Sequence, residues 1–234
     1  MISTIIWNNY HITYVSECGF DALQKFKDFF EKIQKNETGD WKLVGHHDVP
    51  ETAGPEYTWI ISSDSEMGGG IQRVVFKHAV KKKRWNIERA VRGLFARGSS
   101  LIRRIESARK KGFHVPMRIF LFAEKYNYGI VQERFLIAEH IDGIDLRPMW
   151  RDHKEKVWET VLSMHKYKLG WGGDPNMGNF LLVKDGTLRA IDLGFNRPSW
   201  IARGKDLYCL KWLYEISDGR FRFNVLAAKI QNSN

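Results

Sequence analysis

One stretch of the chain, residues 172–194, constrains the fold more than any other. Residues 180–183 are all apolar, and a second, mostly apolar group spans residues 188–191. The tripeptide Lys184-Asp185-Gly186 lies between these groups, and Asp-Gly is a strong signal for the tight turn of a β-hairpin. Because a hairpin brings its two ends together, the residues that flank it are predicted to lie side by side.

Those flanking residues are Asn179, before the first strand, and Asp192, after the second. An amide oxygen beside a carboxylate is a hard-oxygen site suited to Mg²⁺. Asp174 lies five residues before Asn179, where its carboxylate can act as a catalytic base. An Asp, four residues, an Asn, a hairpin and Asp-x-Gly form the pattern of kinase-type phosphoryl transfer. An ordinary hairpin with capping aspartates is the alternative, but it leaves the convergence of these three side chains unexplained.

The bulk composition is that of a folded protein. At 234 residues the chain can form one domain or two small lobes, and 43 % of its residues are hydrophobic. No apolar run reaches the roughly 18–20 residues of a transmembrane helix, and the N-terminus has no signal-peptide pattern. Cys18 and Cys209 form no ligand pattern, so we expect free thiols in a reducing compartment.

The formal net charge is +10, which favours anionic partners such as nucleic acid, a phosphorylated glycolipid or an acidic lipid surface. Basic residues cluster at 81–84 and again between Arg103 and Lys111. Solvated helix faces and a surface that docks an anionic substrate are both compatible with these clusters.

The order of predicted elements is that of an α+β, two-lobed kinase fold, with a β-rich N-lobe over residues 1–140 and a short, mostly helical C-lobe over 141–234. We expect the N-lobe to anchor the nucleotide and the C-lobe to carry the catalytic loop and the metal site. Strands are predicted at 2–15 (a hairpin), 41–46, 57–63, 73–80, 117–124 and 134–140, and helices at 20–35, 86–111, 146–169 and 205–230.

Lys77 lies in the apolar strand Val74–Val80, an uncomfortable place for an ammonium group unless it meets anions. The phosphates of ATP would supply them, while a lysine that extends to solvent is the alternative. Such a lysine usually pairs with a helix glutamate, for which Glu106 is the first candidate and Glu88 the second; a solvated helix residue is the alternative for Glu106.

The strand that ends at Glu139 is predicted to run into a hinge between the lobes. Backbone groups from Glu139 to Ile141 would there hydrogen-bond an adenine; an ordinary strand end is the alternative. His165 is expected to be a packed, hydrogen-bonded residue beneath the catalytic loop. Asp206 is expected either to brace that loop from the following helix or to cap the helix.

These residues carry a resemblance to a known family. The segments Val75-Phe76-Lys77, Leu121–Lys125, Gly173-Asp174-Pro175 with Gly178-Asn179-Phe180, and Ile191-Asp192-Leu193 resemble the lipopolysaccharide core heptose(II) kinases of Gram-negative bacteria, in the protein-kinase-like superfamily. The resemblance covers nearly the whole chain. It implies ATP- and Mg²⁺-dependent phosphorylation of a heptose hydroxyl of the inner core, at the cytoplasmic face of the inner membrane, with peripheral membrane contact and no nucleic-acid partner.

The chain departs from the general kinase pattern at three places. Gly172 replaces the histidine two residues before the catalytic Asp, and Asn176 replaces the lysine or histidine two residues after it. A cation for the γ-phosphate must then come from elsewhere, such as Arg197 or the basic segment. There is no Gly-x-Gly-x-x-Gly between the first two strands of the meander, so residues 46–55 are expected to cover the phosphates.

Two other functions remain open. One is a kinase of the same fold that acts on another small molecule or on a protein; the positive charge disfavours a cationic drug as acceptor. The other is an inactive kinase-like scaffold, against which the joint presence of Asp174, Asn179 and Asp192 with Lys77 argues.

Overall fold

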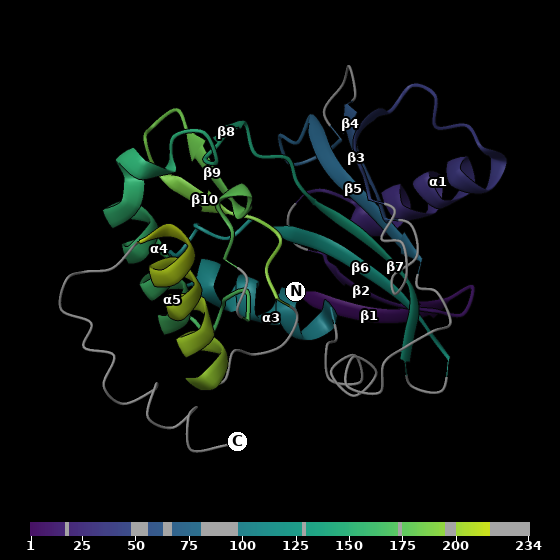
Figure 1. The fold of residues 1–234 in the computed structure, drawn as a ribbon. Coiled ribbons are helices and arrows are strands. Elements are labelled where there is room, and N and C mark those ends of the chain that lie inside the picture. The colour runs from purple at the N-terminus through teal and green to yellow at the C-terminus, as the bar shows by residue number, and fades with distance from the viewer. Residues whose placement is uncertain are drawn as a thin grey trace. The chain divides into compact units, whose positions relative to one another are not determined.

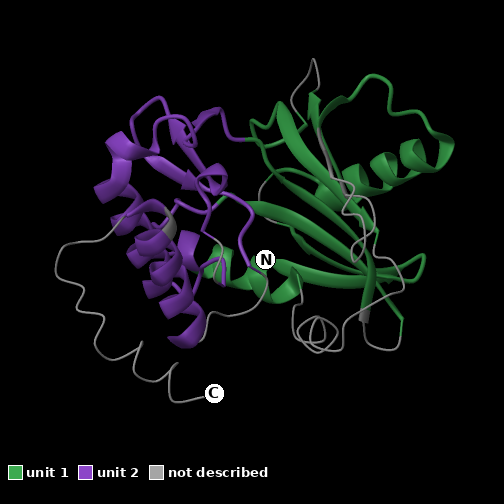
Figure 2. Cartoon of the chain, viewed as in Figure 1, with its two compact units in different colours: residues 1–107, 117–140 green, residues 108–116, 141–234 purple. Residues whose placement is uncertain are grey.

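The computed structural model describes residues 1–16, 19–47, 56–62, 67–80, 98–127, 130–172, 175–194 and 200–215. The chain divides into two compact units (Figure 2), the first formed by residues 1–107 and 117–140 and the second by residues 108–116 and 141–234. The predicted lobes also divide after residue 140, but residues 108–116 group with the second unit although the prediction placed them in the first.

Unit 1 is built on a seven-stranded sheet with the order β1-β2-β6-β7-β5-β4-β3, in which all neighbours are antiparallel (Figure 1). The predicted meander forms its β3-β4-β5 end, and the predicted N-terminal hairpin forms the other edge. The strands are β1 Ile2–Trp7, β2 Tyr10–Val15, β3 Lys42–His47, β4 Glu56–Ser62, β5 Arg73–Val80, β6 Ile119–Asn127 and β7 Ile130–Glu139.

One face of this sheet is covered by helix α1, Ala22–Lys35. The helix begins at Asp21, whose side chain accepts a hydrogen bond from the N–H of Gln24, and ends at Asn36 in the left-handed conformation. Its buried Phe26 and Phe29 pack edge-on against aromatic rings of the sheet, with Phe26 at 5.5 Å from Phe135 and Phe29 at 5.3 Å from Phe76 between ring centroids. The predicted apolar stripe of this helix is therefore core.

The opposite face of the sheet carries Lys77 and receives helix α3, Gly98–Arg109. Lys77 lies directly across from Leu136, and Leu136 lies across from Phe122, so the three side chains share one face. The ring of Phe122 lies against the first residue of α3: a Cβ on Gly98 would be only 2.4 Å from it. Only glycine therefore permits this close approach of helix and sheet.

Unit 2 contains a three-stranded antiparallel sheet, β8 Gly143–Asp145, β9 Phe180–Val183 and β10 Leu188–Ala190, in the order β10-β9-β8. Its helices are η1 Trp150–His153, α4 Lys154–Lys166, η2 Met177–Asn179 and α5 Trp200–Tyr214. Residues 108–116 join this unit because Phe113 stacks on Tyr167, with centroids 4.3 Å apart, and Pro116 forms a bridge with Ala190.

The helices of unit 2 begin at other residues than predicted. Helix α4 starts at Lys154, because the N–H of Leu146 is bound to the carbonyl of Phe180 at 3.2 Å and Pro148 disfavours helical backbone at the residue before it. Helix α5 begins five residues earlier than predicted, with Gly204 inside it. Of the predicted helix 205–230, the part beyond residue 215 lies outside the described residues.

Candidate active site

The predicted hairpin is present as β9 and β10 (Figure 1). Leu182 pairs with Leu188 and Phe180 with Ala190, and the turn is closed by a hydrogen bond from the Val183 N–H to the Thr187 carbonyl at 3.1 Å. Gly186 has a φ of 78°, a conformation that favours glycine. Thr187 donates both its N–H and its hydroxyl to the carboxylate of Asp185 in the turn, which lowers the pKa of that carboxyl.

The far end of the hairpin brings together the residues on either side of it. The N–H of Ile191 donates to the carbonyl of Asn179 at 2.9 Å, so Asn179 is bound to the residue that immediately precedes Asp192. Asp192 has a φ of 51°, a left-handed conformation that turns the chain away from the strand. The predicted juxtaposition of these two residues is therefore present in the backbone.

An amide oxygen and a carboxylate at one end of a hairpin fit the ligand preference of Mg²⁺. No group of three or more His, Cys, Asp or Glu side chains that suits a metal occurs among the described residues. The roles of Asn179 and Asp192 as metal ligands stay predictions.

The proposed base Asp174, with Gly173, lies outside the described residues. The chain that leads to it is held by a buried carboxylate. Asp206 of α5 accepts a hydrogen bond from the backbone N–H of Trp171 at 3.2 Å and contacts Nε2 of His165 at 2.9 Å. Asp206 has no exposed surface and His165 only 7 %.

This contact decides between the two sequence-based roles of Asp206. The residue lies inside α5 and so does not cap it, and it braces the segment before the predicted catalytic loop. A Cβ on Gly170 would be 2.7 Å from the Asp206 carboxylate, so this approach requires glycine. The prediction that His165 is buried and hydrogen-bonded is confirmed.

Trp171 joins the same segment to the end of the hairpin. Its indole Nε1–H donates to the carbonyl of Ile191 at 3.1 Å, and its ring packs on Phe180 at a centroid distance of 5.0 Å. A second link is the hydrogen bond from the Gly194 N–H to the Gly170 carbonyl, at 2.9 Å. The segment before Asp174 and the segment around Asp192 are therefore fixed to each other on the side of unit 2.

The sequence as a whole matches one family model over residues 55–230: "Lipopolysaccharide core biosynthesis protein (WaaY)". The chain belongs to this family. The predicted resemblance is thereby confirmed.

Known relatives of the family agree. The chain is 29 % identical over 182 residues to the lipopolysaccharide core heptose(II) kinase WaaY of Escherichia coli strain K12, which covers 75 % of this chain and 76 % of the relative. A second WaaY of Escherichia coli, with the same description, is 25 % identical over 199 residues, 82 % of this chain and 77 % of the relative.

Among solved structures, that of WaaP in complex with acyl carrier protein superposes with a TM-score of 0.52 at 18 % identity, over 85 % of this chain and 81 % of that one. At this identity the likeness concerns the fold alone. The predicted kinase-like α+β fold is confirmed.

In this WaaY-family chain the proposed nucleotide lysine, Lys77, lies in β5 on the sheet face that receives α3. Its predicted partner Glu106 has another contact. The carboxylate of Glu106, 8 % exposed, accepts two hydrogen bonds from the guanidinium of Arg118, at 2.9 and 3.0 Å. In this structure Glu106 thus pairs with Arg118 in place of Lys77. The second candidate, Glu88, lies outside the described residues.

Arg118 also occupies the end of β7, where the hinge is predicted. The N–H of Glu139 donates to the Arg118 carbonyl at 2.9 Å, and the Glu139 carboxylate accepts from the Arg118 N–H at 3.0 Å. The N–H of Glu139 is therefore already used within unit 1. A donor to adenine would have to come from a later residue such as Ile141, whose side chain is buried.

A further buried carboxylate was not singled out from the sequence. Glu124 of β6, 3 % exposed, accepts hydrogen bonds from the N–H of Gly98, the hydroxyl of Tyr126 and the guanidinium of Arg134. Because Gly98 is the first residue of α3, Glu124 fixes where this helix begins against the sheet. Glu124 falls within the segment Leu121–Lys125 that carried the family resemblance, which was its only signal in the sequence.

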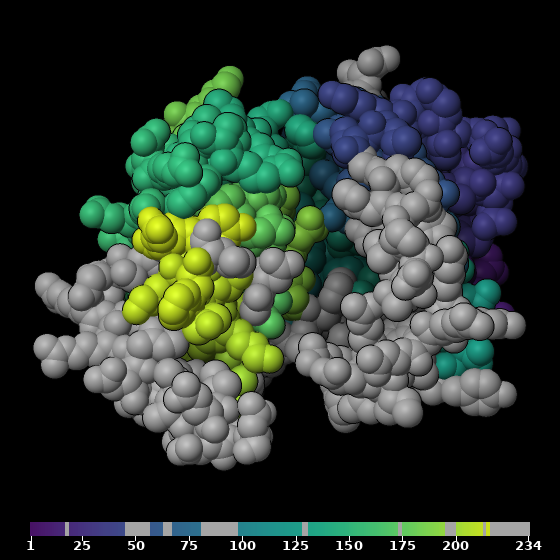
Figure 3. Space-filling model, in the orientation of Figure 1, coloured from purple at the N-terminus to yellow at the C-terminus, as the bar shows by residue number. Residues whose placement is uncertain are grey.

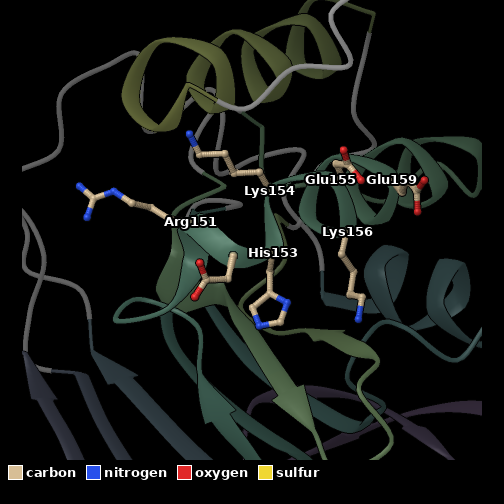
Figure 4. Close-up of a pocket in the computed structure, with 7 residues that line it drawn as sticks. Arg151, His153, Lys154, Glu155, Lys156 and Glu159 are labelled. Atoms are coloured by element: carbon tan, nitrogen blue, oxygen red, sulfur yellow. The ribbon is translucent and has the colours of Figure 1, made fainter.

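A pocket of about 530 Å³ lies elsewhere in unit 2, at the start of α4 (Figure 4). It is lined by Arg151, Asp152, His153, Lys154, Glu155, Lys156 and Glu159. Acidic and basic side chains alternate around it, and none of the predicted site residues lines it. The mixed charge gives it no preference for an anion, so it is distinct in composition from a phosphate site.

Proposed function

We propose that this WaaY-family protein transfers the γ-phosphoryl group of ATP to a heptose hydroxyl of the lipopolysaccharide inner core. Membership of the family supports the reaction class and the acceptor. The structural observation that carries the proposal is the hydrogen bond from Ile191 to Asn179, which brings together two oxygen-bearing residues at one end of the hairpin.

In this proposal Asn179 and Asp192 hold Mg²⁺, which neutralises charge on the phosphate oxygens. Lys77 binds the phosphates of ATP, and backbone groups between Glu139 and Ile141 bind the adenine. Asp174 accepts the proton of the attacking hydroxyl and orients it. The brace from Asp206 and Trp171 supports these assignments, because phosphoryl transfer depends mainly on positioning and on electrostatic stabilisation.

The first test is a mass measurement on the acceptor. Purified protein is incubated with Mg-ATP and lipopolysaccharide core that lacks heptose phosphates, beside an Asp174→Asn variant. We expect the wild-type protein to add one phosphate to the heptose region and Asp174→Asn to reduce the rate by at least about 100-fold. Asp185→Asn is the matched control, since Asp185 lies at the opposite end of the hairpin and the substitution keeps its size.

Three other outcomes would change the proposal. ATP consumption with a different acceptor would retain the kinase and exclude the lipopolysaccharide core. ATP binding without turnover on any acceptor would favour the scaffold alternative. Full activity in Asp174→Asn would exclude Asp174 as the base.

We also propose that the reaction takes place at the cytoplasmic face of the inner membrane, with the protein bound peripherally. Among the described residues, no helix is both long and apolar enough to cross a membrane. Helix α5, the yellow-green segment of Figure 3, has exposed aromatic side chains. Trp200 is 60 % exposed, Tyr208 45 % and Trp212 64 %, and the exposed Lys205 lies between the first two in the sequence. Aromatic and basic side chains together suit the interface of an anionic bilayer.

Vesicle flotation tests this contact. We expect the protein to float with vesicles that contain anionic lipid and to stay in solution with purely zwitterionic vesicles. Trp212→Ser should weaken the association, while Trp158→Phe, a change inside the buried face of α4, should leave it unchanged. Equal flotation of the wild type and Trp212→Ser would exclude α5 as the contact.

A further inference from the structure

The catalytic loop of this chain has no cation at the position where kinases of this pattern carry one, because Asn176 stands there. The structure nevertheless places a guanidinium against the loop. A Cβ built on Gly178 would lie 3.3 Å from Nε and 3.4 Å from Cδ of Arg147, and 3.1 Å from the amide oxygen of Asn176. Arg147 therefore covers the residue immediately before the proposed metal ligand Asn179.

Arg147 is held in this place by Asp145. The backbone N–H of Arg147 donates to Oδ1 of Asp145 at 2.8 Å, its Nε donates to Oδ2 at 2.8 Å, and its Nη2 donates to the same oxygen. Asp145 is itself fixed, because it ends β8 and pairs with Leu181 of β9. The hydrogen bonds from Arg147 lower the pKa of the Asp145 carboxyl, so the carboxylate is charged and orients the guanidinium at neutral pH.

The guanidinium retains binding capacity on its other side. Arg147 is 71 % exposed, and within the described contacts its Nη1 group has no partner. A guanidinium binds phosphate oxygens through two parallel N–H groups, and its charge is permanent. Orientation by a carboxylate on one edge lowers the entropy that the side chain loses when the other edge binds an anion.

We propose that Arg147 binds a phosphate group that reaches the catalytic loop and so replaces the missing cation of this loop. The proposal rests on the proposed kinase function and assigns a residue that the sequence did not indicate. Two sources supply this chemistry, namely the γ-phosphate of ATP and a phosphate already present on the sugar acceptor. Asp145 is a positioning residue for Arg147, and Gly178 leaves room for the guanidinium, which a Cβ at this position would displace by a few tenths of an ångström.

Binding and kinetics of Arg147→Gln test the proposal and separate the two sources. The dissociation constants for ATP and ADP are measured by calorimetry, together with KM for core acceptors with and without phosphate. We expect the affinity for the ligand that provides the phosphate to fall roughly 10- to 100-fold, as for other hydrogen bonds to charged groups. Weaker binding of ATP but not of ADP would identify the γ-phosphate as the source. A higher KM for the phosphorylated acceptor alone would identify the acceptor phosphate.

Two variants show whether geometry matters as well as charge. Arg147→Lys keeps the charge but lacks the two parallel N–H donors of a guanidinium, and Gly178→Ala displaces the guanidinium without removing it. Both variants should show part of the affinity loss of Arg147→Gln. Arg151→Gln is the matched control, because Arg151 is an exposed arginine of η1 away from the loop. Unfolding temperatures of all variants should match the wild type, since Arg147 is a surface residue.

The proposal is overturned if Arg147→Gln behaves like Arg151→Gln in every assay. It is equally overturned if ATP, ADP and both acceptors all weaken by the same factor, which would indicate a general disturbance of the loop. The calorimetric comparison of ATP with ADP needs no acceptor, so a failure of the lipopolysaccharide assignment alone would leave that arm interpretable.

Discussion

In each unit of the molecule, a buried carboxylate fixes the backbone at the start of another segment. In unit 1, Glu124 binds the N–H of Gly98 at the start of α3. In unit 2, Asp206 binds the N–H of Trp171 before the catalytic loop. Both side chains are almost fully buried, at 3 % and 0 % exposed, and both accept hydrogen bonds from backbone and side chain.

The two carboxylates differ in the basic side chain that each of them contacts. Glu124 pairs with Arg134, whose charge cannot be removed, at 2.6 Å. Asp206 contacts Nε2 of the His165 imidazole at 2.9 Å. Loss of the Glu124 carboxylate therefore removes an anionic partner from a permanently charged guanidinium, whereas loss of the Asp206 carboxylate removes one from an imidazole. We infer that Glu124 mainly determines stability and that Asp206 mainly determines the geometry of the catalytic loop.

The substitution with the largest expected effect on stability is Glu124→Gln. The amide cannot neutralise Arg134, so the free energy of unfolding should fall by about 3 kcal/mol, as when one partner of a buried ion pair is removed. The measurement is denaturant unfolding followed by circular dichroism. Glu31→Gln, at an exposed position of α1, is the control. A loss no larger than that of the control would show that Arg134 finds another partner and would remove the contrast.

Asp206→Asn should show the opposite balance. Asn has the same size and can still accept a hydrogen bond, so the unfolding free energy should fall by only about 1 kcal/mol. The rate of phosphoryl transfer should fall by about 100-fold, because small displacements of catalytic groups have effects of this size. Steady-state kinetics with parallel thermal melts would check this. A variant that is badly destabilised yet fully active, once folded, would contradict the assignment of roles.

Trp171→Phe sharpens the same comparison by removing one hydrogen bond and keeping the packed ring. The lost indole bond to Ile191 is worth about 1 kcal/mol, so we expect a roughly fivefold reduction of activity. The concentration of Mg²⁺ needed for half-maximal activity should rise, because Ile191 joins Asn179 to Asp192. Trp7→Phe, at a partly buried indole that ends β1 in unit 1, is the control. An unchanged Mg²⁺ dependence would limit Trp171 to a packing role.

The features that can be predicted from the sequence are those whose contacting residues lie close together along the chain. The hairpin at 180–190 was predictable because its signals, apolar runs and Asp-Gly, lie within a dozen residues. So was the pattern that joins Asn179 to Asp192. The strands of unit 1 were also placed nearly correctly, because alternation and turn residues are local signals.

The contacts that were missed depend on packing between distant segments. Glu124 meets Gly98 across 26 residues, and Asp206 meets His165 across 41. The kinase pattern predicts Glu106 as the partner of Lys77, but the guanidinium of Arg118 offers Glu106 a bidentate partner that spacing alone does not reveal. The location of Arg147 against Gly178 likewise depends on how β8 pairs with β9.

The smallest expected effect concerns a third carboxylate, Glu133 of β7, which is only partly buried. Burial alone would raise its pKa, but hydrogen bonds from His78 at 2.8 Å and Tyr10 at 2.6 Å outweigh this and lower it. Because the folded-state pKa lies below the unfolded value of about 4.5, this stabilisation is complete above that pH and is lost as the pH falls through the folded-state pKa.

Glu133→Gln should lower the free energy of unfolding by about 1 kcal/mol at pH 6 and by progressively less below pH 4, measured by urea unfolding across this range. A difference between the two proteins that stays constant down to pH 3 would show that packing and not charge gives Glu133 its effect, and would separate this carboxylate from Glu124, whose arginine partner makes it far more important for stability.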